Sequence, residues 1–257
     1  NHPSSLLNLI SNLMLTLSMK SHVSLFQFET IILKNNIDGT SNIVTACIEN
    51  KIKRLIHLSS VAALPNPDKK EKLDESFLNS TFFEFATTYG ESKYRSEMEV
   101  WKGMGEGLDV TVFNPGVILG AWKFTDSSVQ MFKSVLKGLP FYSSGLSGFV
   151  SADDVAQGIV SAIENEKSAG ERFILVGANW SFKDLIFSIA DNLGKKRPGI
   201  KVGLKLSEVV AVFAEFFASI TGGKAFITKE LAQSANRRTY FQAEKVQDSL
   251  DLKFRDL

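Results

Sequence analysis

The sequence predicts an α/β fold built on a parallel sheet, and three observations support this prediction. Short apolar runs typical of strands alternate with helical segments up to about residue 177, which is the pattern of a parallel sheet. The chain has 257 residues, a length that suits one large domain, or one domain with a small appendage. Beyond residue 177 the pattern is mostly helical, so we expect a small helical unit at the C-terminus.

The expected elements of the first part follow from apolar periodicity and from the residues that bound each segment. Residues 31–49 carry apolar side chains at helical spacing, and residues 54–58 (RLIHL) indicate a buried strand that leads into a loop. The β-branched run at 110–113 (VTVF) is typical of a strand, which residues 114–116 (NPG) are expected to end. The other elements expected here are helices over 92–103, 126–137 and 151–164, and a strand over 172–176.

Two serines are expected to cap helices. Ser151 precedes Asp154 by three residues, which resembles a capping box, and Ser181 begins a helical segment that Gly194 ends. Both hydroxyl groups therefore predict helix N-termini. Three further helices are expected over 207–220, 228–235 and 243–250.

Composition and charge exclude several classes of function. With 29 Lys and Arg against 28 Asp and Glu, the chain has no generic electrostatic grip on nucleic acid or on an acidic membrane. One Cys excludes a disulfide scaffold, and 3 His without ligand spacing predict that no metal is bound. The Leu-rich start lacks a basic n-region, and no apolar stretch is long enough to span a bilayer. We therefore expect a cytoplasmic protein that acts on a small-molecule substrate.

A tyrosine, a lysine and a serine are the candidate chemical groups. Tyr89 and Lys93 are four residues apart, so a helix places both on one face. An ammonium group there is expected to lower the Tyr89 pKa from its usual value of about 10. Ser60 follows a predicted strand, at the end where parallel sheets bind ligands. Such groups suit proton transfer to an oxygen whose carbon gains or loses a hydride. Taken alone, however, the Tyr–Lys spacing favours an ordinary solvated helical pair.

The order of several motifs favours the chemical interpretation. The motifs are 36–47 (NIDGTSNIVTAC), 55–63 (LIHLSSVAA), 89–93 (YGESK) followed by Glu97, 113–120 (FNPGVILG), 148–156 (GFVSADDVA) and 221–230 (TGGKAFITKE). Over residues 21–257, this order resembles the extended short-chain dehydrogenases/reductases of the NAD-dependent epimerase/dehydratase family. The resemblance is to their dihydroflavonol-reductase-like and 3β-hydroxysteroid-dehydrogenase-like members.

The resemblance implies a domain organisation and an activity. Residues 1–177 would form a Rossmann-like dinucleotide-binding domain that is incomplete at its N-terminus, and residues 178–257 a substrate-binding cap. For some of the later segments before residue 178, the alternative is that they belong to the cap. The implied activity is that of an NAD(P)-dependent oxidoreductase or epimerase/dehydratase. It would act at a hydroxyl or ketone carbon of a sugar nucleotide or of another small alcohol or ketone. A homodimer formed through the helices around 31–49 and 90–103 is also implied.

The resemblance also assigns roles to individual residues. Tyr89 would be the general acid/base, and Lys93 would modify its pKa and bind a ribose hydroxyl of NAD or NADP. Ser60 would orient the substrate oxygen. Asn36 corresponds to an asparagine that supports a water-linked proton relay, although an ordinary helix Asn satisfied by backbone fits as well. Besides Tyr89 and Lys93, the implied cofactor contacts are Ser59, Pro115, Gly116 and Val117.

The chain departs from the family's pattern at its start. No glycine precedes Gly39, so the family's Gly-x-x-Gly-x-x-Gly phosphate loop is absent from the first 38 residues. The family's next strand is expected within residues 13–21, and the glycines at 103–107 are expected to end a helix. Two interpretations stay open. The chain is the later part of a longer enzyme, or it is a degenerate, non-catalytic relative that acts as a sensor or scaffold.

Two features of the C-terminal part also have two interpretations each. A broad apolar stripe over 209–220 fits either the packing of the cap or a contact with a membrane surface or subunit. Arg237 and Arg238 fit either an anionic substrate group or an ordinary surface pair. Neither the substrate nor the choice between NAD and NADP follows from the sequence.

Overall fold

The structure is a computed structural model that describes residues 31–64, 72–76, 85, 87–120, 127–204, 207 and 229–257. The strand expected within 13–21, the helix expected over 207–220 and its apolar stripe lie outside the described residues.

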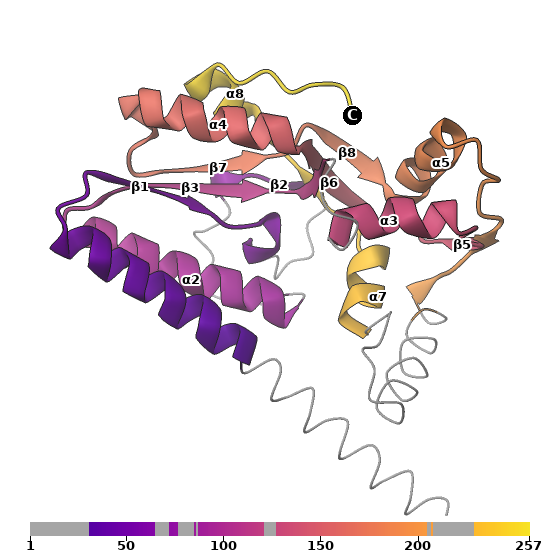
Figure 1. The fold of residues 1–257 in the computed structure, drawn as a ribbon, viewed down its shortest axis with the longest axis horizontal. Helices are drawn as coiled ribbons and strands as arrows, with labels where there is room; N and C mark the ends of the chain where they lie inside the picture. The colour runs from indigo at the N-terminus through magenta and orange to yellow at the C-terminus, as the bar shows by residue number, and fades with distance from the viewer. Residues whose placement is uncertain are drawn as a thin grey trace, which may run out of the picture.

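A three-stranded parallel sheet forms the centre of the larger part of the fold (Figure 1). Its strands are β1 (Arg54–Leu58), β3 (Asp109–Pro115) and β7 (Glu171–Leu175), in the order β1-β3-β7. Leu58 pairs with Phe113 and Pro115 with Leu175, so the carboxyl ends of the strands meet at one edge. The predicted parallel α/β architecture is confirmed.

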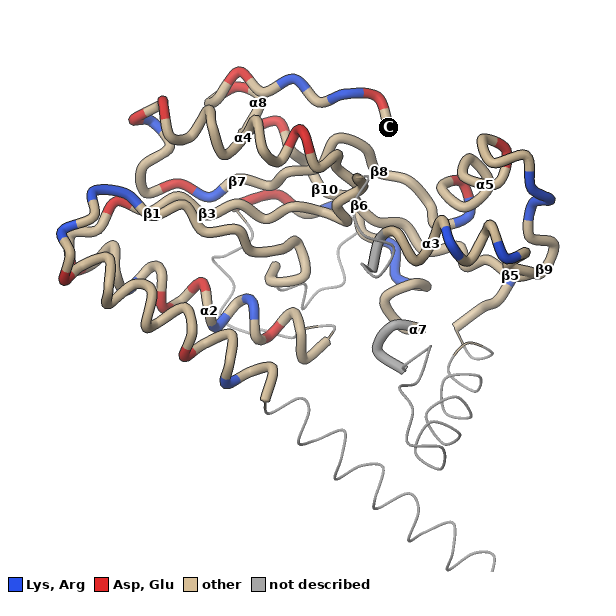
Figure 2. Tube along the Cα trace, in the orientation of Figure 1, with Lys and Arg blue, Asp and Glu red and all other residues tan. Residues whose placement is uncertain are grey.

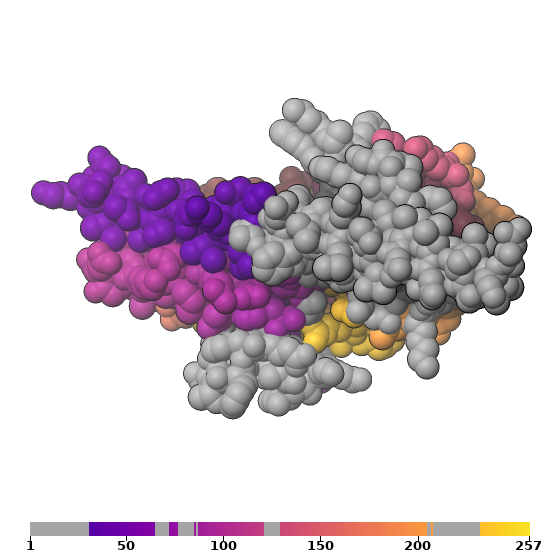
Figure 3. Space-filling view, turned by 90° about the horizontal axis from the view of Figure 1, so that it is seen from below, coloured from indigo at the N-terminus to yellow at the C-terminus, as the bar shows by residue number. Residues whose placement is uncertain are grey.

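Helices cover both faces of this sheet (Figure 1). The helix over residues 31–49 and α2 (Thr88–Gly105) run side by side along one face, as the view from below also shows (Figure 3). On the other face lie α4 (Ala152–Glu164) and α8 (Glu244–Leu250). The buried core on the α2 side consists of Val44, Val100, Leu108, Val110 and Val112. The core on the α4 side includes Phe113, Val155, Ala162, Phe173, Ile174, Val246 and Leu250.

A second, smaller sheet follows the first along the chain. Its strands are β4 (Val117–Leu119), β6 (Leu146–Ser151) and β8 (Ala178–Ser181), with β4 parallel and β8 antiparallel to β6. Two helices share a core with it, α3 (Ser127–Leu136) and α5 (Phe182–Asn192). The sequence did not predict this sheet.

The remaining elements are short. Strand β2 (Lys72–Leu73) pairs with β10 (Tyr240–Phe241), and β5 (Phe141–Tyr142) pairs with β9 (Ile200–Lys201). Two 3₁₀ turns are η1 (Val61–Ala63) and η3 (Glu166–Ser168), and α7 (Lys229–Asn236) follows a stretch outside the described residues. The C-terminal part returns to the first sheet, because Phe241, Val246 and Leu252 belong to the core beneath α4. The division of the chain at residue 177 stays a prediction.

The observed boundaries confirm most predicted elements and correct three details. Strand β1 has the predicted bounds, but four of its five side chains are only half-buried and Leu58 is exposed, since the described residues give it a strand neighbour on the β3 side alone. Helix α2 begins at Thr88, four residues before the predicted start. Strand β3 continues to Pro115, because Asn114 is buried and the register with β7 extends to Leu175.

The predicted helix ends are also confirmed. The Ser151 hydroxyl accepts a hydrogen bond from the backbone N–H of Asp154 at 3.0 Å, and Ser181 caps α5 in the same way through Asp184. The glycines at 103–107 end α2, and Gly107 has a φ of 97°.

Acidic and basic side chains both lie along α2, whereas residues 195–197 form a short basic run between α5 and β9 (Figure 2). Among the described residues, we find no helix with the length and apolar composition that crossing a membrane requires.

A layer of buried polar groups lies between the first sheet and α2. Arg172 on β7 and Glu97 on α2 form an ion pair with 2.5 Å between Nη2 and Oε2, and their side chains are 4% and 0% exposed. The Arg172 guanidinium also lies 5.6 Å from the centre of the Trp101 ring. His57 on β1 belongs to the same layer. Its burial, and then the charges of Lys93 and Arg172, lower the pKa of His57 to about 4.

We predict opposite effects on stability for two glycine-to-alanine substitutions. A Cβ on Gly116 would lie 2.4 Å from the carbonyl oxygen of Gly148, and neither backbone is free to move aside. Gly116→Ala should therefore lower the free energy of unfolding by about 1–3 kcal/mol. Gly39 lies inside a helix, and a Cβ added to it would have nothing within 4 Å, so Gly39→Ala should raise the free energy of unfolding by about 0.5–1 kcal/mol. Urea denaturation measures both changes, and changes of the same sign would contradict this packing.

We also predict that His57 makes the protein less stable in mild acid. Because the folded-state pKa of about 4 lies below the ordinary histidine value of 6.5, the unfolded chain binds the proton more readily between these values. The free energy of unfolding should therefore fall as the pH decreases through this interval, by at most about 3 kcal/mol. Urea unfolding of the wild type and of His57→Phe from pH ~7 to ~4 measures this contribution, since carboxyl groups titrate in both proteins. Parallel curves for the two proteins would refute it.

Candidate active site

The loop that carries Ser59 and Ser60 leaves the first sheet at its carboxyl edge. The backbone N–H of Ser59 donates to the carbonyl oxygen of Phe113 at 2.8 Å, which continues the β1–β3 ladder by one residue. Ser60 is extended and caps η1, since its hydroxyl oxygen accepts the N–H of Ala62 at 3.1 Å. That hydrogen bond fixes the Ser60 oxygen and leaves its proton available to a second partner.

Helix α2 begins next to this loop. Thr87 caps it by accepting the N–H of Gly90 at 3.0 Å, and Tyr89 lies in the first turn. A Cβ on Gly90 would lie 2.4 Å from the carbonyl oxygen of Ala62, so no larger residue fits here without a shift of the backbone. The absence of a side chain at Gly90 is therefore what allows the start of α2 to approach η1 so closely.

This approach brings three predicted residues together. The Ser60 hydroxyl lies close enough to the side chain of Tyr89 to influence its pKa, and the Lys93 Nζ lies 5.9 Å from the centre of the Tyr89 ring. Tyr89 as a whole residue is 44% exposed, so it lies at the surface of this edge of the sheet. A proton donor, a second hydroxyl and a cation thus meet at the edge of a parallel sheet, which is where such folds bind ligands.

The prediction that Lys93 lowers the pKa of Tyr89 is wrong for this structure. Burial raises the pKa of Tyr89 above its usual value, and the hydrogen bond from Ser60 opposes that rise. Burial likewise lowers the pKa of Lys93, while the nearby Glu97 carboxylate raises it. Desolvation of the phenolate therefore outweighs the attraction inferred from the sequence spacing.

Asn36 contacts the same turn of α2 from the neighbouring helix. Its side-chain amide donates to the Ser92 hydroxyl at 3.0 Å, and that hydroxyl donates to the carbonyl oxygen of Tyr89 at 2.8 Å. The Ser92 hydroxyl therefore links Asn36 to the backbone of Tyr89. Its role in a proton relay stays a prediction.

The residues expected to contact the cofactor share the carboxyl edge of the sheet. Ser59 is 6% exposed, and its hydroxyl has no hydrogen-bond partner within the described part of the chain. Pro115 is buried at the end of β3, Val117 begins β4, and the N–H of Gly116 donates to the carbonyl oxygen of Leu175 at 3.0 Å.

Among the described residues, the buried Ser59 hydroxyl has a free donor and acceptor next to Ser60 in sequence, and together with Lys93 and Tyr89 it fits the hydroxyl and amide groups of the ribose and carboxamide of a nicotinamide cofactor. The structure thus has residues that suit this end of the cofactor. The region in which the family's phosphate loop would be sought, residues 1–30, lies outside the described residues.

Three buried polar residues next to the site were not predicted to have a role. From the sequence, Asn114 is expected only to end a strand, Glu97 only to belong to a motif, and Arg172 only to lie in a strand. The side-chain amide of Asn114 donates to the carbonyl oxygen of Ser60 at 2.8 Å and to the Glu97 carboxylate at 2.7 Å. An Asn that directly follows a β-branched run, and a Glu four residues after Lys93 on one helix, are the sequence signals that point to this cluster.

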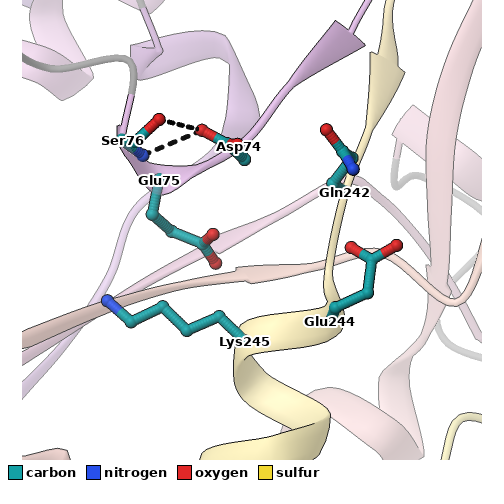
Figure 4. A pocket seen from close by; sticks show the side chains of 6 residues that line it. All are labelled: Asp74, Glu75, Ser76, Gln242, Glu244 and Lys245. Carbon is teal, nitrogen blue, oxygen red and sulfur yellow. Dashed lines mark hydrogen bonds between the residues drawn. The ribbon is translucent and has the colours of Figure 1, made fainter.

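A separate cavity of about 570 Å³ lies between β2 and the start of α8 (Figure 4). It is lined by Asp74, Glu75, Ser76, Gln242, Glu244 and Lys245. The Glu75 carboxylate accepts the N–H of Ile174 at 2.8 Å, and burial raises the pKa of Glu75. This hydrogen bond satisfies a backbone group on the outer edge of β7, which is a structural role. Among the described residues, we find no group of three His, Cys, Asp or Glu side chains placed to hold a metal ion.

The two C-terminal arginines are held near the second sheet. The Arg238 guanidinium donates to the carbonyl oxygen of Ser144 at 3.4 Å, and the carbonyl oxygen of Arg237 accepts the N–H of Leu146 at 2.8 Å. Their binding of an anionic substrate group stays a prediction.

Proteins similar in sequence include several reductases. The putative dihydroflavonol 4-reductase of Synechocystis sp. is 26% identical over 238 residues, which cover 90% of this chain and 69% of that protein. An anthocyanidin reductase of Vitis vinifera is 32% identical over 199 residues, which cover 68% of this chain and 56% of that protein. The chain thus spans little more than half to about two thirds of the length of these relatives.

Solved structures share the fold. The crystal structure of gox2253 has a TM-score of 0.70 and 28% identity, over 88% of this chain and 69% of that one. DesIV, a dTDP-glucose 4,6-dehydratase from Streptomyces venezuelae with NAD bound, has a TM-score of 0.66 over 89% of this chain and 63% of that one. At 16% identity, the likeness to DesIV shows the fold alone.

The family model of the NAD dependent epimerase/dehydratase family matches residues 20–177. This range contains the first sheet together with Ser60, Tyr89 and Lys93. The match covers more than half of the chain, and the described fold agrees with it. The chain belongs to the NAD-dependent epimerase/dehydratase family.

Proposed function

We propose that the protein reduces a ketone, or oxidises the corresponding secondary alcohol, with NAD or NADP as the hydride carrier. The observation that carries the proposal is the close approach of the Ser60 loop to the start of α2, which brings Ser60, Tyr89 and Lys93 together at the carboxyl edge of the sheet. Family membership supports the cofactor class. The names of the dihydroflavonol, anthocyanidin and tetraketide pyrone reductases support a reduction as the reaction.

The reaction needs a proton at the substrate oxygen, and the chain's residues supply it. In the direction of reduction, Tyr89 would donate its proton to the carbonyl oxygen. The Ser60 hydroxyl, held by the N–H of Ala62, would turn its single proton from Tyr89 to the same oxygen when the substrate binds. Lys93 would stabilise the phenolate that Tyr89 becomes. The bound cofactor supplies or accepts the hydride at the substrate carbon. Its nicotinamide end would be held by Ser59, Lys93, Tyr89 and the backbone of residues 115–117.

A sugar nucleotide is the second substrate class. A UDP-N-acetylglucosamine 4,6-dehydratase of Campylobacter jejuni is 28% identical over 199 residues, which cover 74% of this chain. A reaction of this class that begins by oxidising a sugar hydroxyl would use the same Tyr89 and Ser60, so substrate trials should include both classes.

The helix over 31–49 and α2 also support a proposal about assembly. They lie side by side at the surface (Figure 3), and Ile31 and Ile43 are 55% and 56% exposed. These exposed side chains support a homodimer formed through this face. Cytoplasmic location, and the lack of nucleic-acid and metal partners, stay predictions.

We predict that Tyr89→Phe lowers turnover by roughly 10²- to 10⁴-fold, because it removes the proton donor and leaves the ring in place. The dissociation constant of the nicotinamide cofactor should change by no more than about twofold, since the hydroxyl is one of several contacts. Steady-state kinetics and fluorescence titration with the reduced cofactor measure the two quantities. Tyr240→Phe is the matched control, because Tyr240 has the same exposed fraction of 44%.

Unchanged turnover in Tyr89→Phe would show that Tyr89 is not the proton donor. A wild-type protein that binds the cofactor but turns over neither ketones nor sugar nucleotides would favour the non-catalytic sensor or scaffold.

We predict a pH profile set by the raised pKa of Tyr89. Reduction requires the protonated phenol, and burial keeps the phenol protonated beyond its usual pKa of about 10. The value of kcat/KM for reduction should therefore stay level through neutral pH and fall only above about 10, while the value for oxidation rises towards alkaline pH. Initial rates in both directions measure this. A fall in the reduction rate between pH ~6 and ~8 would show that another group controls the proton.

A further inference from the structure

The side-chain amide of Asn114 links the two elements that carry the chemical groups. Its nitrogen donates to the carbonyl oxygen of Ser60 at 2.8 Å and to the Oε1 of Glu97 at 2.7 Å. Asn114 and Glu97 are both fully buried, the first on β3 and the second on α2. The NH₂ group has two protons, so this pair of hydrogen bonds uses its whole donor capacity.

The Glu97 carboxylate is fixed from its other side. Its Oε2 lies 2.5 Å from the Nη2 of Arg172 on β7, and the Arg172 guanidinium lies 5.6 Å from the centre of the Trp101 ring. A chain of contacts therefore runs from β7 through α2 and β3 to the Ser60 loop. The polar groups along it are shielded from solvent, so the geometry of one restricts that of the next.

A role in stability alone would not require such a cluster. Buried ion pairs are often no more stabilising than apolar side chains of similar size, because desolvation offsets the attraction. Here the polar groups are located at the point where the Ser60 loop meets α2. Gly90 permits that approach by its contact with Ala62, but it does not orient Ser60.

We propose that Asn114, held in place by the Glu97–Arg172 ion pair, positions Ser60 so that its hydroxyl and that of Tyr89 act on the same substrate oxygen. This inference rests on the proposed function and adds to it a residue that touches neither substrate nor cofactor. Asn114 is thus a positioning residue.

The pKa of the Tyr89 phenol depends on the position of the Ser60 hydroxyl. The hydrogen bond from Ser60 lowers the pKa of Tyr89 against the effect of burial, so loss of that bond raises the pKa further. The charged and titratable groups on this part of α2 are Glu91, Lys93, Tyr94, Arg95 and Glu97, and the neighbouring strands add Arg172 on β7 and His57 on β1. All of them remain in the variants used below.

The test compares Asn114→Ala with Thr111→Val. Thr111 is also fully buried on β3, and its hydroxyl donates to a main-chain carbonyl, that of Ser168, at 2.7 Å. Both substitutions therefore remove a buried hydrogen bond to a main-chain carbonyl from the same strand, but only Asn114 contacts Ser60. Two quantities are measured: kcat and KM with a ketone substrate, and the pKa of Tyr89 from tyrosinate absorbance after subtraction of the Tyr89→Phe spectrum.

We expect Asn114→Ala to lower kcat by roughly 10- to 100-fold with KM changed by less than about twofold, and to raise the Tyr89 pKa. Thr111→Val removes one buried hydrogen bond from the same strand and should leave both quantities at their wild-type values. The proposal is overturned if Asn114→Ala leaves the Tyr89 pKa unchanged, or if both variants lower kcat alike.

A replacement variant and a measurement without substrate complete the test. If Asn114→Ala does not fold, Asn114→Thr replaces it, because a single hydroxyl proton satisfies only one of the two acceptors and should produce the same changes at smaller size. If the wild type turns over no ketone or sugar nucleotide, the proposed function fails. The Tyr89 titration still decides the positioning role in that case, since it requires no substrate.

Discussion

The close approach between the start of α2 and the η1 loop is the constraint on which the site depends. Gly90 has no side chain, and the carbonyl oxygen of Ala62 occupies the space that a Cβ would fill. Because of this contact, Tyr89 and Ser60 meet at the carboxyl edge of the sheet although 29 residues separate them in sequence. The parallel register of β1 and β3 fixes the point at which the η1 loop leaves the sheet. The Thr87 cap fixes the first turn of α2.

The chemistry that follows is a balance of opposing effects on one phenol. Burial disfavours the phenolate and raises the pKa of Tyr89, whereas the Ser60 hydroxyl favours it. A phenol that remains protonated at neutral pH is suited to donate a proton to a carbonyl oxygen. The buried ion pair between Glu97 and Arg172 lies behind this turn, so the reactive edge rests on an ordered polar layer rather than on apolar packing alone.

Local patterns predicted the first sheet, because short apolar runs are visible along the chain. Ser60, Tyr89 and Lys93 were assigned through the resemblance of several ordered motifs to a family, since the Tyr–Lys spacing alone fits an ordinary helical pair. The second sheet could not be predicted, since β4, β6 and β8 have three to six residues each and depend on distant partners. The contact of Asn114 with Ser60 could not be predicted for the same reason, because the two residues are 54 positions apart in the sequence. The direction of the Tyr89 pKa shift was wrong because a four-residue spacing carries no information about burial.

In the proposed function, Tyr89 and Ser60 bind one substrate oxygen next to the cofactor. The most direct test is a crystal structure of the protein with oxidised nicotinamide cofactor and an alcohol product. We predict that the alcohol oxygen lies within about 3 Å of both hydroxyl oxygens, with its carbon facing the nicotinamide ring. An alcohol oxygen bound to neither hydroxyl, with the cofactor seated elsewhere than at the carboxyl edge of the sheet, would contradict this claim.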